Sequence, residues 1–257
     1  MHPIIFQTNF FILHTLWLFF VIGVIAGTYA MIKLSIKNGL KIQFISENFL
    51  KFFLFGIIAA RLSFIILNYE IYFSELSIDS LFRLFYVWDK GLYFWPGLIA
   101  SFISFYDACK KNDQNFYKWL DILVPSIIIG LGITHIGAFF DGINYGIETS
   151  LPWGVNFESP SIKYAVPIHP TQIYAFLYST IIATTLILMG HNEKIKSKAP
   201  GFIGFLGIIG YSSFRFLEEF IRGDDTILIV GVRLDQVITL LVLISATWFF
   251  YKRLHLS

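Results

Sequence analysis

The sequence predicts an all-α integral membrane protein with about seven transmembrane helices, in a single polytopic domain over residues 1–257. Three observations lead to this prediction. The chain is 56% hydrophobic and only 14% charged, with a mean hydropathy of +0.69, whereas a soluble domain carries about 25% charged residues. Long apolar segments recur along the whole chain. Lysines gather in every second connection between these segments.

The apolar segments are long enough to cross a bilayer, which takes about 20 mostly apolar residues. Seven segments fit this description: 10–32, 52–68, 91–106, 119–136, 170–190, 201–221 and 234–251. The first is too long for a signal peptide and is followed by lysines, so we expect it to remain as an anchor. The third is short. The fifth begins at Pro170, which suits a first helical turn because proline lacks the N–H that would be unpaired there.

The distribution of lysines predicts the orientation of the chain. Cytoplasmic connections carry an excess of Lys and Arg. The lysines follow the first, third, fifth and seventh segments: Lys33, Lys37, Lys41, Lys51, Lys110, Lys111, Lys118, Lys194, Lys196, Lys198 and Lys252. We therefore expect the amino terminus outside and the carboxyl terminus inside. The outward connections are then about 69–90, 137–169 and 222–233.

A dense cluster of charge, RFLEEFIRGDD, ends the sixth apolar segment. Residues three and four apart share a helix face, so Arg215 can pair with Glu219, and Glu218 with Arg222. Tyr211 lies on the same stripe. One interpretation is an interfacial helix end held by ion pairs. The other places Arg215 inside the membrane boundary, where an ionisable group usually has a function and a guanidinium can grip a lipid phosphate through parallel hydrogen bonds.

Two further polar clusters flank the fifth segment. HPTQIY, residues 169–174, would place His169, Gln172 and Tyr174 at its outer mouth, either as an ordinary helix start or around a headgroup. The second cluster is the glycine-rich stretch 134–157, whose glycines permit tight turns or close backbone approach. Its candidate residues are His135, Gly137, Asp141, Gly142 and Gly146.

Other signals are few. Arg61 lies deep in the second segment, and a buried arginine needs an anion or a cage of hydrogen bonds. The six histidines show no metal-ligand spacing, so no metal site is predicted. No basic run interleaved with aromatic residues suggests a nucleic-acid partner. The lone Cys109 excludes an internal disulfide.

Five stretches, in order along the chain, resemble motifs of the prolipoprotein diacylglyceryl transferase family. HIGAFFDGINYGIETSLPWGV resembles the family's signature loop, and HPTQIY its His-Pro-Ser/Thr-Gln-Leu-Tyr motif. YSSFRFLEEFIRGDD resembles its Tyr–Arg–Glu–Arg–Pro-Asp block. MHPIIFQTNFFI and AARLSFIILNY resemble its amino terminus and second helix.

The resemblance implies a multi-pass enzyme of the bacterial cytoplasmic membrane that needs no cofactor. Such an enzyme moves a diacylglyceryl group from phosphatidylglycerol to the lipobox cysteine of a prolipoprotein. On the hypothesis of an active transferase, we expect Arg215 to hold the phosphate, Glu219 to orient it, and His135 or His169 to serve as the base. Together with Asp141 and Arg222, which the polar clusters themselves indicate, the positions that match the family give a set of candidate substrate-binding residues: Arg61, Gly137, Asp141, Gly142, Gly146, Gln172, Tyr174, Tyr211 and Arg222.

The chain departs from the family pattern at four positions. Trp95 stands where the family has histidine, and His135 where it has the signature arginine. Ala138 replaces an asparagine, and Ile143 falls at the loop's usual glutamate. Two alternatives to a divergent transferase therefore stay open: a paralogue that binds lipid or lipoprotein without turnover, and a small transporter. The transporter is disfavoured because the chain lacks inverted-repeat hydropathy.

Overall fold

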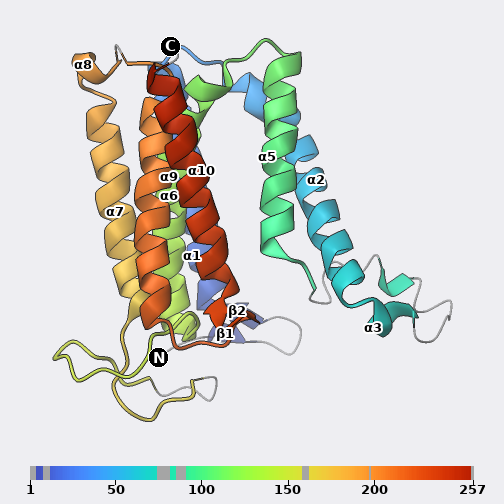
Figure 1. The fold of residues 1–257 in the computed structure, drawn as a ribbon, viewed down its shortest axis with the longest axis vertical. Helices are drawn as coiled ribbons and strands as arrows, with labels where there is room; N and C mark the ends of the chain where they lie inside the picture. Colours follow the sequence, from blue (N-terminus) through green and yellow to red (C-terminus); the bar gives the residue numbers. More distant parts are fainter. Residues whose placement is uncertain are drawn as a thin grey trace. The chain divides into compact units, whose positions relative to one another are not determined.

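The computed structural model describes residues 4–7, 12–73, 82–84, 91–157, 162–196 and 198–255 (Figure 1). The chain divides into two compact units. The first unit comprises Met1–Asn38 and Tyr117–Ser257, and the second comprises Gly39–Phe116. Most of the expected outward connection 69–90 lies outside the described residues, as does much of the amino-terminal motif. The expectation of one domain over the whole chain stays a prediction.

The first unit is a helical bundle with short strands at one end. Its elements in order are β1 (Ile4–Gln7), β2 (Ile12–His14), α1 (Thr15–Lys37), α6 (Phe116–Asp141), α7 (Thr171–Met189), α8 (Glu193–Lys196), α9 (Phe202–Glu218), η1 (Glu219–Ile221), β3 (Leu228–Ile229), β4 (Val232–Arg233) and α10 (Leu234–His255). β1 pairs with β2 and β3 pairs with β4, both antiparallel.

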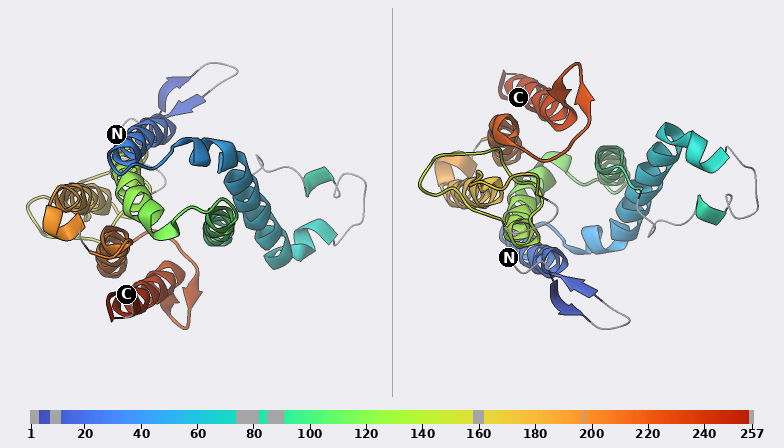
Figure 2. Two further views of the ribbon diagram at one scale, coloured as in Figure 1. Left: turned by 90° about the horizontal axis from the view of Figure 1, so that it is seen from above. Right: turned by 90° about the horizontal axis from the view of Figure 1, so that it is seen from below.

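Helix α6 lies at the centre of this bundle, between α1, α7 and α9 (Figure 2). Small residues let the helix backbones approach closely. A Cβ on Gly23 of α1 would lie 2.5 Å from the carbonyl oxygen of Gly130, and one on Gly27 would lie 2.8 Å from that of Ser126. Glycines at such crossings are typical of membrane helices, where close packing replaces the hydrophobic drive.

The second unit contains α2 (Gln43–Leu67), α3 (Tyr69–Phe73) and α5 (Phe94–Lys111). α2 and α5 also pack through small residues, because a Cβ on Gly97 would lie 3.0 Å from the carbonyl oxygen of Gly56. Towards its end α2 carries the buried Arg61.

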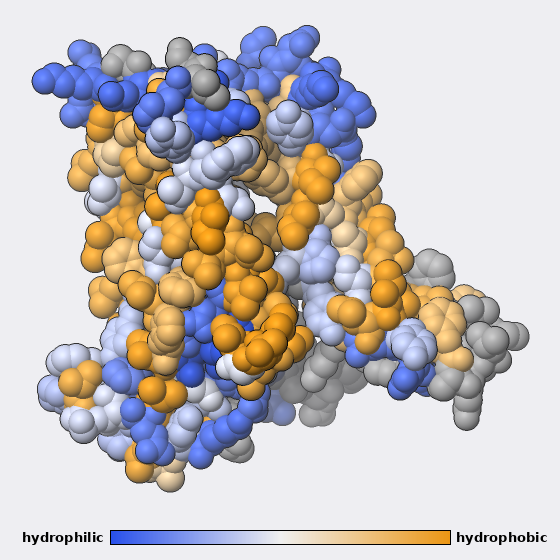
Figure 3. Space-filling view, in the orientation of Figure 1, coloured by the Kyte–Doolittle hydropathy of each residue, from blue (hydrophilic) through white to orange (hydrophobic). Residues whose placement is uncertain are grey.

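The expected membrane segments are confirmed in part. Each of the seven overlaps a long helix, and five of these helices are long and apolar enough to cross a membrane: α1, α2, α6, α7 and α10. α5 and α9 have 18 and 17 residues and are not among those five, so the count of seven and the orientation stay predictions. In the first unit, hydrophobic surface covers the middle of α7, α9 and α10, with hydrophilic surface at both ends (Figure 3).

Two boundaries differ from the sequence prediction. The first helix was expected at 10–32, but Ile12–His14 pair with Ile4–Gln7 as a strand, and the helix begins at Thr15. A short apolar run cannot be assigned to strand or helix by hydropathy alone. α6 continues to Asp141, so the first turns of the expected outer loop 137–169 are helical.

Candidate active site at the end of helix α9

The site is built on one stripe of α9, where Tyr211, Arg215 and Glu218 follow each other at intervals of four and three residues. The helix then tightens into the 3₁₀ turn η1, which carries Glu219. A tightened last turn is a common way for a helix to end. Glu218 and Glu219 lie three and four residues after Arg215, a spacing that places both carboxylates on the side of the guanidinium.

Arg215 pairs with two carboxylates. Its Nη1 donates to Glu218 Oε1 at 2.6 Å, and its Nη2 lies 2.5 Å from Glu219 Oε1. The expected pairing of Arg215 with Glu219 is thereby confirmed. The pairing of Glu218 with Arg222 is also confirmed, at a longer 3.7 Å. Glu218 was expected to pair with Arg222, but it lies closer to Arg215.

Arg222 ties this helix end to the loop that follows α6. Its Nη2 donates to the side chain of Asn144 at 3.0 Å, and its Nε donates to Asp224 Oδ1 at 2.6 Å. The Arg222 side chain is almost completely buried. Asp224 therefore neutralises it at close range, while Glu218 and Glu219 lie further away.

Arg233, from β4, is a member of the site that the sequence did not indicate, as are Asn144 and Tyr178. Its Nε donates to Glu219 Oε2 at 2.6 Å and its Nη2 to Asp224 Oδ1 at 2.9 Å. The pKa of Asp224 is held below its ordinary value of 3.8, because the hydrogen bond from Arg222 and the charges of Arg222 and Arg233 outweigh the burial that alone would raise it. An isolated arginine after an apolar run gives no local signal for a contact 14 residues away.

These six residues form what we call the buried charge network: Arg215, Glu218, Glu219, Arg222, Asp224 and Arg233. With every member ionised, three arginines balance three carboxylates, as buried charge requires. The Glu219 side chain has no exposed surface. Its Oε1 is close to Arg215 Nη2 but accepts no well-directed hydrogen bond among the described residues, so this oxygen is held by charge alone.

Three further side chains border the network: His135 of α6, Tyr178 of α7 and Tyr211 of α9. Tyr178 of α7 donates from its hydroxyl to Glu218 Oε2 at 2.8 Å. Tyr211 stacks edge-on against Tyr178, with ring centroids 5.6 Å apart. The Tyr211 hydroxyl lies 3.5 Å from His135 Nε2. His135 therefore reaches the network through Tyr211, as an imidazole held next to the arginine stripe.

Backbone hydrogen bonds join the loop after α6 to two other segments, the one before α7 and the one after η1. Gly146 N–H donates to the carbonyl of His169 at 3.0 Å, and Gly223 N–H donates to that of Tyr145 at 2.9 Å. A Cβ on Gly146 would lie 2.5 Å from His169 Cβ and 2.9 Å from the Ile221 carbonyl oxygen. Only glycine fits there. Gly142 has a φ of +71° and ends α6 in the left-handed conformation that glycine adopts freely.

The HPTQIY motif anchors this loop from the other side. Gln172 donates from Nε2 to the carbonyl of Ile143 at 2.6 Å, and Thr171 donates from Oγ1 to the carbonyl of Asn144 at 2.5 Å. Asn144 is thereby placed to accept the hydrogen bond from Arg222. Gln172 thus positions the loop, and its other amide atom, Oε1, is buried without a hydrogen bond among the described residues.

His169 and Tyr174 form a separate cluster. His169 Nδ1 lies 3.2 Å from the Tyr174 hydroxyl, which also accepts a hydrogen bond from Trp153 Nε1 at 2.8 Å. Within the described part of the chain, the hydrogen bonds and ring contacts of His169 include none with a member of the buried charge network. Of the two histidines predicted as bases, the structure brings only His135 next to the α9 stripe.

Three predicted binding residues have other neighbours. Gly137 lies within α6, where a Cβ would meet Phe19 Cβ of α1 at 2.7 Å, so it serves helix packing. Asp141 lies 3.6 Å from His14. Arg61 belongs to the second unit, where it donates to the carbonyls of Leu84 at 3.0 Å and Gly91 at 3.1 Å. The cage of hydrogen bonds predicted for Arg61 is therefore present.

Comparison with known proteins decides the family. Residues 3–252 match the model of the family described as prolipoprotein diacylglyceryl transferase. The chain belongs to this family. The match covers the elements that build the charge network, from α6 to the beginning of α10, and it also covers the HPTQIY motif and the AARLSFIILNY stretch of α2.

Several relatives carry the name phosphatidylglycerol–prolipoprotein diacylglyceryl transferase. The protein from Prochlorococcus marinus (strain MIT 9215) is 31% identical over 221 residues, which are 79% of this chain and 73% of that protein. The protein from Finegoldia magna is 30% identical, with 87% of this chain and 84% of that protein covered. The protein from Clostridium tetani is 28% identical over 97% of both chains.

The positions that depart from the family pattern have defined surroundings. Ala138 is buried in α6, and its carbonyl accepts the N–H of Ile143 at 3.2 Å. The carbonyl of Ile143 accepts the Gln172 amide. At position 143, where the family has a glutamate, this chain therefore offers only a backbone carbonyl. The carboxylates of the network belong to Glu218, Glu219 and Asp224. Trp95 lies in the first turn of α5, in the second unit.

Proposed function

We propose that the protein is a membrane transferase that moves a diacylglyceryl group from an anionic phospholipid resembling phosphatidylglycerol to the cysteine thiol of a prolipoprotein signal peptide. Family membership and the names of its relatives support this activity. The structural observation that carries it is the buried charge network at the end of α9. Binding of lipid without turnover is not favoured by these matches, because the relatives are named as transferases.

The reaction needs a cationic group at the leaving phosphate and a base at the thiol. The sulfur forms a bond to the glycerol carbon, the bond from that carbon to the phosphate oxygen breaks, and the electron pair leaves with glycerol phosphate. The thiol proton must pass to a base. Fixed donors aimed at the developing charge are usually the largest contribution to such catalysis.

Arg215 is the proposed phosphate ligand. A guanidinium has five N–H groups, and the two glutamates contact one terminal nitrogen each. N–H donors therefore remain for a phosphate oxygen, while Glu218 and Glu219 fix the plane of the guanidinium. A group held in this way does not have to reorganise when charge develops on the leaving oxygen.

His135 is the proposed base, and Glu219 orients Arg215. His135 is the predicted histidine that lies next to the arginine stripe, 3.5 Å from Tyr211. Gln172, Gly142 and Gly146 hold the loop that places Asn144 beside Arg222. We place the site on the outer side of a bacterial cytoplasmic membrane, opposite the lysine-rich connections.

The test is direct transfer by the purified full chain in detergent. With phosphatidylglycerol and a lipobox-cysteine peptide, mass spectrometry should show a diacylglyceryl thioether and an equal amount of released glycerol phosphate. Replacing Arg215 with glutamine should lower kcat by about 10²–10³-fold. His135→Gln should lower it strongly and His169→Gln only weakly. Folded wild-type protein that modifies no peptide would overturn the proposal.

A further inference from the structure

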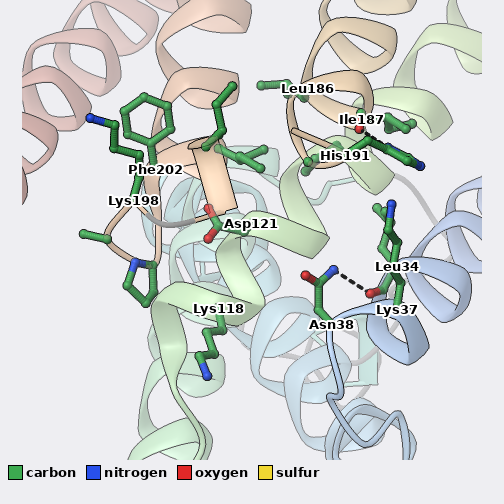
Figure 4. A pocket seen from close by; sticks show the side chains of 16 residues that line it. Leu34, Lys37, Asn38, Lys118, Asp121, Leu186, Ile187, His191, Lys198 and Phe202 are labelled. Carbon is green, nitrogen blue, oxygen red and sulfur yellow. Dashed lines mark hydrogen bonds between the residues drawn. The ribbon is translucent and has the colours of Figure 1, made fainter. Parts of the chain in front are cut away.

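A cavity of about 250 Å³ lies within the first unit, at the end of the bundle opposite the charge network (Figure 4). Helix α9 begins beside this cavity at Phe202 and runs 17 residues to Glu218. At 1.5 Å per residue, the two sites are about 25 Å apart along the helix. The cavity is therefore a separate site, and no residue of the charge network lines it.

The cavity is lined by cationic side chains from three different segments. Lys37 comes from the end of α1, Lys118 from the beginning of α6, and Lys198 from the connection before α9. In Figure 4 the side chains of Lys118 and Lys198 extend away from Asp121, and Lys37 lies across the cavity from Lys198. Within the described part of the chain, neither Lys37 nor Lys198 forms an ion pair. Even without Lys118, two lysines against one aspartate leave an excess of positive charge among the lining residues.

Asp121 is already engaged by the protein. Its carboxylate accepts the backbone N–H of Gly201 at 2.7 Å and that of Gly204 at 2.8 Å. It thereby caps the beginning of α9, where unpaired N–H groups would otherwise attract an anion. The helix end is therefore already occupied, and the lysines are the cationic lining groups left for an anion that enters the cavity.

The rest of the lining is mostly apolar and comes from the helix ends. These side chains are Leu34, Pro125, Leu186, Ile187, Phe202 and Ile203. A cavity with cations at its rim and aliphatic walls matches a molecule with a charged head and an apolar body. A free metal cation would be repelled by the same lysines.

We propose that this cavity binds the phosphate group of an anionic phospholipid from the adjacent leaflet. The lysines surround the phosphate, and the aliphatic wall contacts the glycerol and the beginning of the acyl chains. Basic pockets between membrane helices recognise such headgroups, because each lysine near the surface strengthens the attraction about fivefold. The site is distinct from the proposed transfer site and does not depend on turnover there.

The experiment counts retained lipids by native mass spectrometry of the full chain in detergent. Delipidated protein is incubated with phosphatidylglycerol or with phosphatidylcholine. The double variant Lys37→Gln/Lys198→Gln should retain phosphatidylglycerol about 20-fold more weakly than wild type. Its retention of phosphatidylcholine should not change, because that headgroup carries no net charge.

The matched control is Lys33→Gln/Lys194→Gln. It removes two lysines from the same two regions of the chain, and neither residue lines the cavity. This control should retain phosphatidylglycerol as the wild type does. Arg215→Gln should also keep this pocket-dependent lipid, so failure at the transfer site can be told apart from failure here.

Three outcomes decide the proposal. Equal loss of lipid from both lysine pairs would show a general effect of surface charge and would overturn it. Unchanged retention by the cavity variant would also overturn it. If free glycerol phosphate raises the unfolding temperature of wild type but not of the cavity variant, and no lipid is retained, the site binds phosphate and the lipid source is wrong.

Discussion

At the scale of single residues, Arg233 is the side chain on which the charge network depends. It bonds both Glu219 and Asp224 and is largely buried. Removing one partner of a buried pair leaves charge uncompensated, which costs about 3–5 kcal/mol. Arg233→Gln should therefore lower the unfolding temperature in detergent by roughly 6–12 °C, measured by intrinsic fluorescence.

The control for this variant is an exposed ion pair at the same end of the bundle. Lys163 pairs with Asp225, and both side chains are more than half exposed. Such pairs contribute little because water and salt screen them. Lys163→Gln should leave the unfolding temperature unchanged. An equal effect of the two substitutions would contradict the role assigned to Arg233.

Asp224 gives the network a dependence on pH with a definite sign. Its pKa in the folded protein lies below the ordinary value of 3.8, so the unfolded chain takes up the proton first. Its contribution to stability is complete above pH 3.8 and is lost as the pH falls through the folded pKa. The groups that face it are the guanidinium groups of Arg222 and Arg233.

The difference in unfolding temperature between wild type and Asp224→Asn should therefore be large at pH 7 and shrink as the pH drops below about 4. Thermal unfolding of both proteins across pH 3–7 measures it. Comparing the two proteins removes the contribution of other carboxylates. A difference that stays constant over this range would show that Asp224 is not the titrating group.

The local part of the site could be predicted from the sequence, and the long-range part could not. Arg215, Glu218 and Glu219 lie within five positions, so helical spacing alone brings them together. Arg233 and Asn144 reach the same place from distant segments, through the hairpin after α9 and the loop after α6. Their contacts depend on how the chain folds back, which composition and periodicity do not encode.

At the scale of elements, the loop after α6 depends on one glycine. A Cβ on Gly146 would lie 2.5 Å from His169 Cβ and 2.9 Å from the Ile221 carbonyl oxygen. Both belong to segments that the loop joins by backbone hydrogen bonds. Gly146→Ala should separate these segments, move Asn144 from Arg222 and strongly lower transfer to the peptide.

Gly210 of α9 is the matched control. A Cβ there would meet the nearest atoms, on Ile182, at 3.8 Å, an ordinary contact. Because alanine is a better helix former than glycine by about 1 kcal/mol, Gly210→Ala should keep full transfer and equal or higher stability. Hydrogen exchange of residues 142–157 should rise in Gly146→Ala alone. Normal activity in that variant would contradict the proposed role of the loop.

Hydropathy predicts which segments are helices better than where they begin. It placed the seven long helices found among the described residues but missed nine residues at the beginning of α2, which runs from Gln43 although the apolar segment was placed at 52–68. Those residues mix polar and apolar side chains. They form the first turns of a helix whose later turns are apolar. An average of hydropathy over a window detects the apolar turns but not the more polar turns before them.

At the scale of the whole molecule, the proposed chemistry requires the two ends of the bundle to face opposite sides of the membrane. α7 has 19 residues, which at 1.5 Å each span about 28 Å, close to the thickness of the hydrocarbon core. The connection before it carries the loop beside the charge network, and the connection after it carries the lysines. The lysine distribution predicts that the network end is outside.

Cysteine labelling in intact bacteria tests this orientation. In a Cys109→Ser background, which removes the buried native thiol, Thr149→Cys and Lys194→Cys place single cysteines on either side of α7. A membrane-impermeant maleimide should label Thr149→Cys in intact cells, and Lys194→Cys only after the membrane is opened. The reverse pattern would put the charge network on the cytoplasmic side. Prolipoprotein acceptors and the phospholipid headgroups that they meet would then have to be sought there, and the cavity at the lysine-rich end would face the outer leaflet.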